Sequence, residues 1–172
     1  MLHTATHMTD VEHRAYIGLG SNLDGPQQRI EHALATLDNL PLTRLITHSP
    51  LYASQPVGPQ DQPDFVNAVA LLATRLSPLA LLDQLQALEQ AQRRLRERHW
   101  GPRTLDLDLL LFDDRYLDLP RLRVPHPAMR ERAFVLVPLA DIAPHELIDG
   151  HRVDRLAAHL GHDALRCLSP QR

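Results

Sequence analysis

The sequence is poor in cysteine, in aromatic residues and in long apolar runs, and each shortage excludes a class of protein. Cys167 is the only cysteine among 172 residues, so an intramolecular disulfide or a zinc site built from several cysteines is excluded, and we expect a reducing compartment. Aromatic residues make up 4% of the chain, which leaves leucine, alanine and valine to fill the core. No apolar run approaches the roughly 18 residues of a membrane span, and residues 1–14 lack the apolar segment of a signal peptide. We therefore expect a cytoplasmic protein that makes no membrane contact.

Basic residues are too few for a general nucleic-acid-binding protein. The chain has 18 lysines and arginines against 21 aspartates and glutamates, a formal net charge of -3, whereas a nucleic-acid binder should carry an excess of basic residues. The basic residues are clustered instead, at Arg93, Arg94, Arg96, Arg98 and Arg103. Such a cluster predicts a local site for an anion.

The length and the hydrophobic content of 44% fit one globular domain with a sizeable core. We expect residues 1–14 to be a flexible N-terminal extension, in which Met8 could be the true start. Residues 15–172 are expected to form a single domain.

Apolar residues at helical spacing, and apolar runs bounded by turn residues, predict the element order β-α-β-β-α-β. Strands are expected at residues 15–20, 43–53, 65–74 and 104–112, and helices at residues 26–40 and 78–92. This order is typical of the ferredoxin-like α+β sandwich, a mostly antiparallel sheet with helices on one face. Extra C-terminal elements are expected to follow: a loop, a short helical segment and an amphipathic helix at residues 151–160.

Two acids interrupt the leucine-rich strand that is expected at residues 104–112. Because side chains alternate between the faces of a strand, Leu105, Leu107 and Leu109 should point toward the helices, and Asp106 and Asp108 should lie about 6–7 Å apart on the opposite face. Two carboxylates this close repel each other unless a cation lies between them, and hard oxygen ligands suit Mg²⁺. The alternative is that both acids simply face water, because Asp-x-Asp is a very short pattern. The arginines directly before the pair favour a site for metal and phosphate.

Those arginines also allow two interpretations. Arg103 follows a rigid Gly-Pro pair, and its planar guanidinium can bind a phosphate through two hydrogen bonds. Arg94 and Arg96 are expected on a loop that could close over a substrate. The alternative is a solvated, basic helix end that complements the helix dipole, and this is the favoured interpretation for Arg93 and Arg98.

Four segments, taken in order, resemble the 6-hydroxymethyl-7,8-dihydropterin pyrophosphokinase family of the folate pathway. They are AYIGLGSNL, VGPQDQPDFVNAV, RLRERHWGPRTLDLDLLLF and RLRVPHPAMRERAFVLVPLADIAP, and they cover most of residues 15–144. The resemblance implies a ferredoxin-like α+β fold. It also implies that ATP donates its β,γ-pyrophosphoryl group to the hydroxymethyl oxygen of the dihydropterin, that AMP leaves, and that two Mg²⁺ ions bridge the triphosphate. We expect a monomer whose partners are these small molecules.

The resemblance also implies a role for each candidate residue. Asp106 and Asp108 match the metal ligands. The positions that match arginines contacting or closing over ATP are Arg94, Arg96 and Arg103. The positions that match the nucleotide site are Gln86, Glu89, Trp100, Leu109, Arg121, His126 and Arg132. The positions that match the pterin pocket are Ser54, Gln55, Val57, Phe65, Asn67 and Phe134. In this pocket Phe65 and Phe134 would stack on the ring, and Asn67 would pair with its edge.

Some of these positions carry a structural alternative or depart from the family pattern. Phe65 could be a simple core residue, Trp100 could only plug its loop against the sheet, and a lone histidine after a proline, such as His126, is more often structural than catalytic. Pro127 stands where many family members carry a tyrosine, and Gln55 stands where proline is frequent. One nucleotide contact is therefore expected to be missing.

Two other functions fit parts of the sequence. A ferredoxin-like RNA-binding sheet would expose aromatic side chains beside a basic groove, but here the expected open face carries carboxylates and aromatic residues are scarce. A metal-dependent phosphohydrolase would use the same aspartates, but it would need a group that activates water and would release phosphate without any pterin.

Overall fold

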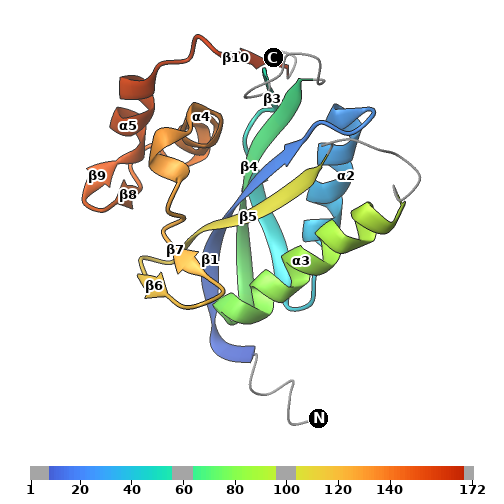
Figure 1. The fold of residues 1–172 in the computed structure, drawn as a ribbon. Coiled ribbons are helices and arrows are strands. Elements are labelled where there is room, and N and C mark those ends of the chain that lie inside the picture. Colours follow the sequence, from blue (N-terminus) through green and yellow to red (C-terminus); the bar gives the residue numbers. More distant parts are fainter. Residues whose placement is uncertain (1–7, 56–63, 96–103, 169–172) are drawn as a thin grey trace.

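An antiparallel β-sheet forms the centre of the computed structural model, which describes residues 8–55, 64–95 and 104–168 (Figure 1). Its strands follow the order β10-β3-β4-β1-β5, and β2 pairs with the far half of β4. All of these pairings are antiparallel. The strands are β1 (Met8–Ser21), β2 (Thr43–His48), β3 (Tyr52–Ser54), β4 (Phe65–Leu76), β5 (Leu105–Phe112) and β10 (Leu165–Cys167). The predicted mixture of helices with an antiparallel sheet is confirmed.

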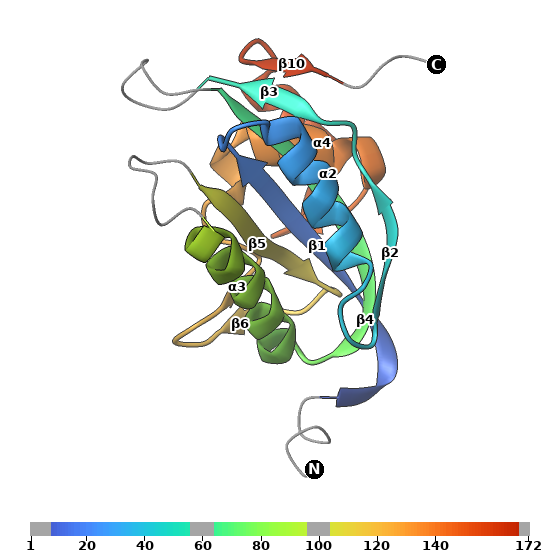
Figure 2. The same ribbon diagram turned by 90° about the vertical axis from the view of Figure 1, so that its right-hand side faces the viewer.

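Helices cover both faces of the sheet (Figure 2). The helices α2 (Pro26–Leu37) and α3 (Pro78–Leu95) pack on one face, where Ile30, Leu81 and Leu107 belong to one buried cluster. The prediction that helices lie on one face alone is wrong, because α4 (Ala133–Ile142) and α5 (Val153–Leu160) pack on the other face in a second cluster. The segment AFVLVPLADI of α4 is apolar on nearly every side, so it is stable only between two other elements.

Short elements connect β5 to the C-terminal helices. They are the hairpin β6 (Leu117–Asp118) and β7 (Arg123–Val124), the 3₁₀ turn η1 (Met129–Glu131), and the hairpin β8 (Leu147–Ile148) and β9 (His151–Arg152). The last helix was expected from residue 151, but residues 151–152 belong to β9 and α5 starts at residue 153. Within the described residues, no helix combines the length and the apolar character that crossing a bilayer requires.

The single strand predicted at residues 43–53 is instead two strands, β2 and β3. The chain bends between them at Ser49 and Pro50, and proline has no N–H for a sheet ladder. The buried Ser49 hydroxyl accepts a hydrogen bond from the backbone N–H of Val69 at 3.0 Å. The same hydroxyl donates to the carbonyl of Pro50 at 2.7 Å, so the side chain replaces a ladder partner where the strand is broken.

Strand β2 also carries one residue more than its partner. Leu45 pairs with Leu72 and Thr47 pairs with Leu71, so Ile46 is extra and forms a bulge. Among the described residues, β2 pairs with β4 only. Ile46 is 37% exposed on this edge.

Two elements are longer than the sequence predicted. Strand β1 begins at Met8, so residues 8–14, which were expected in a flexible extension, are the start of a strand. Its polar residues are held by specific contacts, including a 2.6 Å bond between His13 Nδ1 and Asp113 Oδ2. Helix α3 extends to Leu95, which places Arg93 and Arg94 on the helix and not on a loop. Arginine is a good helix former, so the helix continues beyond its last buried leucine.

Candidate active site

The two aspartates of β5 point away from α2 and α3, as predicted. Leu107 and Leu109 are buried in the cluster under those helices, and Asp106 and Asp108 line a cleft on the opposite face. In the neighbouring strand β1, Gly20 lies opposite Asp106 and Gly18 lies opposite Asp108. Because directly opposite residues share one face of a sheet, the glycines leave the floor of the cleft beside both carboxylates free of side chains.

This first cleft has a volume of about 580 Å³. Strands β1, β3, β4 and β5 supply its floor, and the segment around the start of α4 supplies its wall. The lining residues with side chains in the predicted site are Ser54, Gln55, Phe65, Asn67, Asp106, Asp108, Arg132 and Phe134. Aromatic rings, amide and hydroxyl groups therefore lie in the same cleft as the acid pair, and this combination suits a flat polar ring that binds next to a cation.

Asn67 is fixed in the floor of this cleft. It is 3% exposed, and its Nδ2 donates a hydrogen bond of 2.8 Å to the Ser54 hydroxyl. Asn67 lies opposite Gly20 in the pairing of β4 with β1, and a Cβ atom on Gly20 would lie 3.2 Å from Asn67 Oδ1. Phe65 is two residues away on the same face of β4, as predicted, so the glycine, the amide and the ring form one side of the cleft.

Arg132 and Phe134 form the opposite wall, where α4 begins. Arg132 is the N-cap residue of α4, and its carbonyl accepts hydrogen bonds from the N–H groups of Val135 and Leu136 at 3.0 and 2.9 Å. Its guanidinium carbon lies 5.6 Å from the centre of the Phe134 ring, within the range of a cation–π contact. The helix therefore holds one cation and one aromatic ring against the cleft.

The electrostatics of the acid pair favour a cation. Burial of the Asp106 carboxyl raises its pKa above the usual aspartate value, and the negative charge of Asp108 raises it further. The Thr104 hydroxyl, which donates to Asp106 Oδ2 at 3.0 Å, and the charge of Arg132 act in the opposite direction. Among the described residues no third acidic, histidine or cysteine ligand joins the pair. Two carboxylates on one face, with room for water and phosphate oxygens, fit Mg²⁺.

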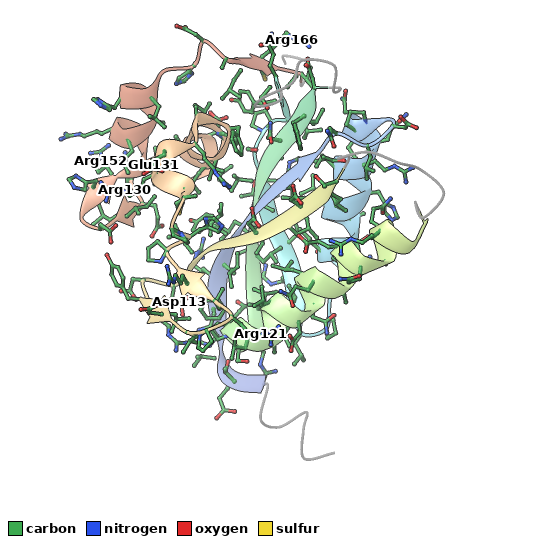
Figure 3. The ribbon with its side chains drawn as sticks, in the orientation of Figure 1. Asp113, Arg121, Arg130, Glu131, Arg152 and Arg166 are labelled. Atoms are coloured by element: carbon green, nitrogen blue, oxygen red, sulfur yellow. The ribbon has the colours of Figure 1, made fainter. Side chains whose placement is uncertain are left out.

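A second cleft of about 620 Å³ opens on the other side of Asp108. It lies between α3 and the segment that contains β6 and β7, and Asp108 lines both clefts. The lining residues that belong to the predicted nucleotide site are Gln86, Glu89, Leu109, Arg121 and His126. Figure 3 shows Arg121 beside α3 and Glu131, which lines the first cleft, beside α4. The acid pair thus lies where two different ligands can meet.

Arg121 is held at the edge of the second cleft by two residues of α3. Its Nη2 donates to Asp83 Oδ1 at 2.6 Å and to Gln86 Oε1 at 2.9 Å. The side chains of Arg121 and Asp83 are about half exposed, so water screens this ion pair and its contribution to stability is small. Its consequence is positional, because it places a permanent cation at the mouth of the cleft.

His126 and Glu89 line the second cleft close to Asp108. Burial lowers the pKa of His126, Asp108 opposes that shift and Arg132 adds to it. The Nδ1 of His126 accepts a 3.2 Å hydrogen bond from the N–H of Ala128, so the neutral ring carries its proton on Nε2. Burial raises the pKa of Glu89 even though Glu89 Oε2 accepts a 2.7 Å hydrogen bond from the Leu107 N–H. Glu89 therefore binds the backbone between the two aspartates.

Several predicted residues cannot be placed in this geometry. Val57, Arg96, Trp100 and Arg103 lie outside the described residues, and of Arg94 the structure describes only its position on α3. Sequence reasoning also missed residues that shape the site. These are Gly18, Gly20 and Glu131, which line the first cleft, and Asn22, which binds Thr104. The segment GLGSN held the available signal, since two glycines at alternate positions of a strand leave one face without side chains.

The chain is similar to known proteins over the residues that form this site. The family model for 7,8-dihydro-6-hydroxymethylpterin-pyrophosphokinase matches residues 16–144. A Pseudomonas aeruginosa protein named 2-amino-4-hydroxy-6-hydroxymethyldihydropteridine pyrophosphokinase is 58% identical over 146 residues, which are 84% of this chain and 90% of that protein. A Haemophilus influenzae protein of the same name is 49% identical over 150 residues, which cover 84% of this chain and 94% of that protein.

Solved structures share the fold. The Plasmodium falciparum HPPK-DHPS wild type with pteroate aligns with a TM-score of 0.70 at 15% sequence identity. The alignment covers 86% of this chain and 42% of that one, so the present chain spans less than half of the longer structure. At this identity the likeness bears on the fold alone.

Proposed function

Because the chain belongs to the 7,8-dihydro-6-hydroxymethylpterin-pyrophosphokinase family, it transfers pyrophosphate from ATP to hydroxymethyldihydropterin in folate biosynthesis, and we propose that Asp106 and Asp108 are the centre of this reaction. The observation that carries the proposal is that the two clefts meet at Asp108. A transfer between two substrates requires both to reach one point.

In this proposal Asp106 and Asp108 hold two Mg²⁺ ions. The support is the chemistry of the pair: two carboxylates on one strand face, one of them with a raised pKa, facing a cleft. When bound, the ions would neutralise charge on the triphosphate and orient its oxygens. The acid pair supplies two ligands, which is typical of Mg²⁺ sites that share the metal with water and phosphate.

The second cleft takes the nucleotide. Gln86, Glu89, Leu109 and Arg121 line it, and Arg121 supplies a cation that two α3 side chains hold in place. His126 offers a neutral N–H donor to a phosphate oxygen, because its other nitrogen already accepts from the backbone. Pro127 lines the same cleft and has neither a side-chain donor nor an acceptor, so the contact that a tyrosine would make there is absent.

The first cleft takes the pterin. Phe65 and Phe134 provide apolar faces for a flat ring, and Asn67 and Ser54 provide a donor and acceptors for its polar edge. Gln55 lines the same cleft. Arg132 lines the same cleft, its guanidinium carbon lies 5.6 Å from the Phe134 ring and its charge acts on Asp106, so it would meet the phosphate that is transferred. The hydroxymethyl oxygen of a ring bound in this way would be directed toward Asp106 and Asp108.

The chain's own residues then act mainly by position and charge. Phosphoryl-type transfer requires alignment of the attacking oxygen and neutralisation of developing charge more than covalent help from the protein. Arg121 and Arg132 supply positive charge from the two sides of β5, and the glycine floor lets both ligands approach the sheet. Within the described residues we assign no general base, because alignment and charge account for the transfer.

The remaining predicted residues complete this proposal from the resemblance alone. Arg94, Arg96 and Arg103 would contact ATP or close over it, Trp100 would line the nucleotide site, and Val57 would line the pterin pocket. Steady-state kinetics would test these roles, since substitution of arginines that contact ATP should alter the KM for ATP and substitution of pocket residues should alter the KM for pterin.

The same proposal extends to the fold and the state of the protein. We infer a ferredoxin-like core and a single pyrophosphokinase domain, which the strand order β3-β4-β1-β5 with α2 and α3 on one face supports. We infer that the protein is cytoplasmic and acts as a monomer; the monomer is supported by the side chains of one chain that line both clefts. The proposal includes no nucleic-acid partner, since the net charge is -3.

The test combines the protein, ATP and Mg²⁺ with and without the hydroxymethyl dihydropterin, and follows phosphorus-containing products by NMR. AMP and the pterin pyrophosphate should form only when pterin is present. Repeating the reaction with Asp106→Asn and Asp108→Asn tests the metal assignment, because both variants should lose turnover and Mg²⁺-dependent nucleotide binding. Phosphate release without pterin would favour the phosphohydrolase instead.

A further inference from the structure

The residue that follows β1 reaches across to the strand that carries the acid pair. Asn22 is fully buried, and its Oδ1 accepts a 2.9 Å hydrogen bond from the N–H of Thr104. The N–H of Asn22 donates in turn to the carbonyl of Thr104 at 3.3 Å. Thr104 is therefore held by both its peptide groups at the point where β5 begins.

Thr104 in turn restrains the side chain of Asp106. Residues 104 and 106 share a strand face, and the Thr104 hydroxyl donates to Asp106 Oδ2 at 3.0 Å. A hydroxyl that donates to one carboxylate oxygen fixes the rotation of the carboxyl group and leaves the other oxygen, Oδ1, to coordinate a cation. The Asp106 side chain would otherwise have to lose its rotational freedom when the metal binds.

We propose that Asn22 and Thr104 are positioning residues that orient Asp106 toward its metal: Asn22 fixes Thr104, and the Thr104 hydroxyl fixes the carboxylate. This inference deepens the proposed function and rests on it, because it assumes that Asp106 is a ligand of Mg²⁺. Neither residue needs to touch the metal or a substrate. Outer partners of this kind hold metal ligands in the geometry that binding requires.

A second contact, from α3, holds the same strand between the two aspartates. Glu89 Oε2 accepts from the N–H of Leu107 at 2.7 Å, so α3 holds the peptide between the two aspartates. The strand is therefore fixed at residue 104 from β1 and at residue 107 from α3. The backbone is held at these two points, but the carboxyl group of Asp106 between them can still rotate. The Thr104 hydroxyl restricts that rotation.

The test removes only the hydroxyl. Thr104→Val keeps the shape of the side chain, and Thr104→Ser restores the donor. We measure the binding of a non-hydrolysable ATP analogue by calorimetry over a series of Mg²⁺ concentrations, together with thermal unfolding without metal. Thr104→Val should raise the Mg²⁺ concentration for half-maximal binding about tenfold, the lower end of the effect of losing an outer partner of a metal ligand, with at most a small fall in the melting temperature. Thr104→Ser should lie close to the wild type.

A threonine elsewhere provides the matched control. The Thr36 hydroxyl donates to the carbonyl of His32 at 3.0 Å on the exposed face of α2, away from both clefts. Thr36→Val should leave the Mg²⁺ dependence as it is in the wild type. Asn22→Ala should raise the Mg²⁺ requirement at least as much as Thr104→Val and should also lower the melting temperature, because it leaves the Thr104 N–H without its partner.

The outcomes separate this inference from the proposed function. If the wild type binds the analogue in a Mg²⁺-dependent way that Asp106→Asn abolishes, but Thr104→Val behaves like the wild type, the positioning role is overturned and the metal assignment stands. If nucleotide binding by the wild type does not depend on Mg²⁺, the metal assignment is refuted, and the positioning role is refuted with it. A lower melting temperature for Thr104→Val with an unchanged Mg²⁺ requirement would make Thr104 merely structural and would also overturn the inference.

Discussion

Asp108 is the residue that both clefts share. Its replacement should affect catalysis without affecting the stability of the fold. Asp108→Asn keeps the volume and removes the charge, so kcat/KM should fall about 10³-fold, in the range of lost electrostatic stabilisation. The melting temperature should not fall, because the side chain belongs to neither core. Asp114→Asn, at an exposed turn, is the control. Turnover at the wild-type rate in Asp108→Asn would refute the metal assignment.

Asp106 makes a second prediction, on stability. Burial raises its pKa in the folded protein, so the folded state holds this proton more tightly than the unfolded chain. Stability therefore falls as the pH rises from the unfolded pKa through the folded one. Without metal, Asp106→Asn should raise the melting temperature at pH 7, and the difference should vanish below about pH 3.9, the usual aspartate value. Melting curves over a pH series check this, and Mg²⁺ with nucleotide should reverse the order.

Gly18 and Gly20 form a matched pair for the floor of the first cleft. A methyl group on Gly20 would lie 3.2 Å from Asn67 Oδ1, whereas one on Gly18 would meet Leu110 at an ordinary 3.4 Å. Gly20→Ala should therefore displace Asn67 and weaken pterin binding about tenfold. Gly18→Ala should weaken it less. Titration of both variants with pterin compares them, and equal losses would show that the Asn67 contact is not the cause.

Among the elements, the break between β2 and β3 is stabilised by the side chain of Ser49. Ser49 Oγ accepts from the Val69 N–H at 3.0 Å in a buried place. Ser49→Ala leaves that N–H unsatisfied, which costs about 1–3 kcal/mol. Urea denaturation should show this loss in the free energy of unfolding. Thr36→Ala, at an exposed helix position, should change it by less than about 0.5 kcal/mol; a similar loss there would contradict the buried-bond explanation.

The elements also show which parts of the fold can be predicted from the sequence. Helices α2 and α3 and strand β5 follow from apolar periodicity within each segment, and strand β4 follows from a continuous apolar run that is buried almost throughout. The break at Ser49 and Pro50 was not predicted. Pro50 was a signal for it in the sequence, but the hydrogen bond from the Val69 N–H to Ser49 Oγ lies between two strands and cannot be read from one segment. Helix α4 was not placed on the second face, since a segment apolar on all sides carries no information about which side it buries.

Some residues of the site could also be predicted from the sequence, and others could not. Alternation within one strand was enough to place Asp106 and Asp108 on the face away from the leucines. The glycine floor and the contact from Asn22 to Thr104 required the register between β1 and its neighbours. Alternation within β1 indicates a strand face without side chains at Gly18 and Gly20, but it does not contain that register, so the residues that these glycines and Asn22 face became visible only in the assembled sheet.

For the whole molecule, two clefts that meet at one carboxylate predict a complex with both ligands. The pterin and a non-hydrolysable ATP analogue with Mg²⁺ should bind together, and neither should exclude the other. Calorimetric titration of pterin with and without the nucleotide checks this. The nucleotide should at most tighten pterin binding by the reciprocal coupling of linked sites. Competition between the ligands would place both in one cleft and contradict the assignment.

The extra residue in β2 affects the tendency of this protein to self-associate. Ile46 interrupts the regular spacing of donors and acceptors along a strand that, in the described part of the chain, has a partner on one side only. A regular edge invites another molecule to add its own strand, and a bulge makes that addition unfavourable. Shortening β2 by this one residue would leave the catalytic clefts in place and produce a protein prone to aggregate in concentrated solution.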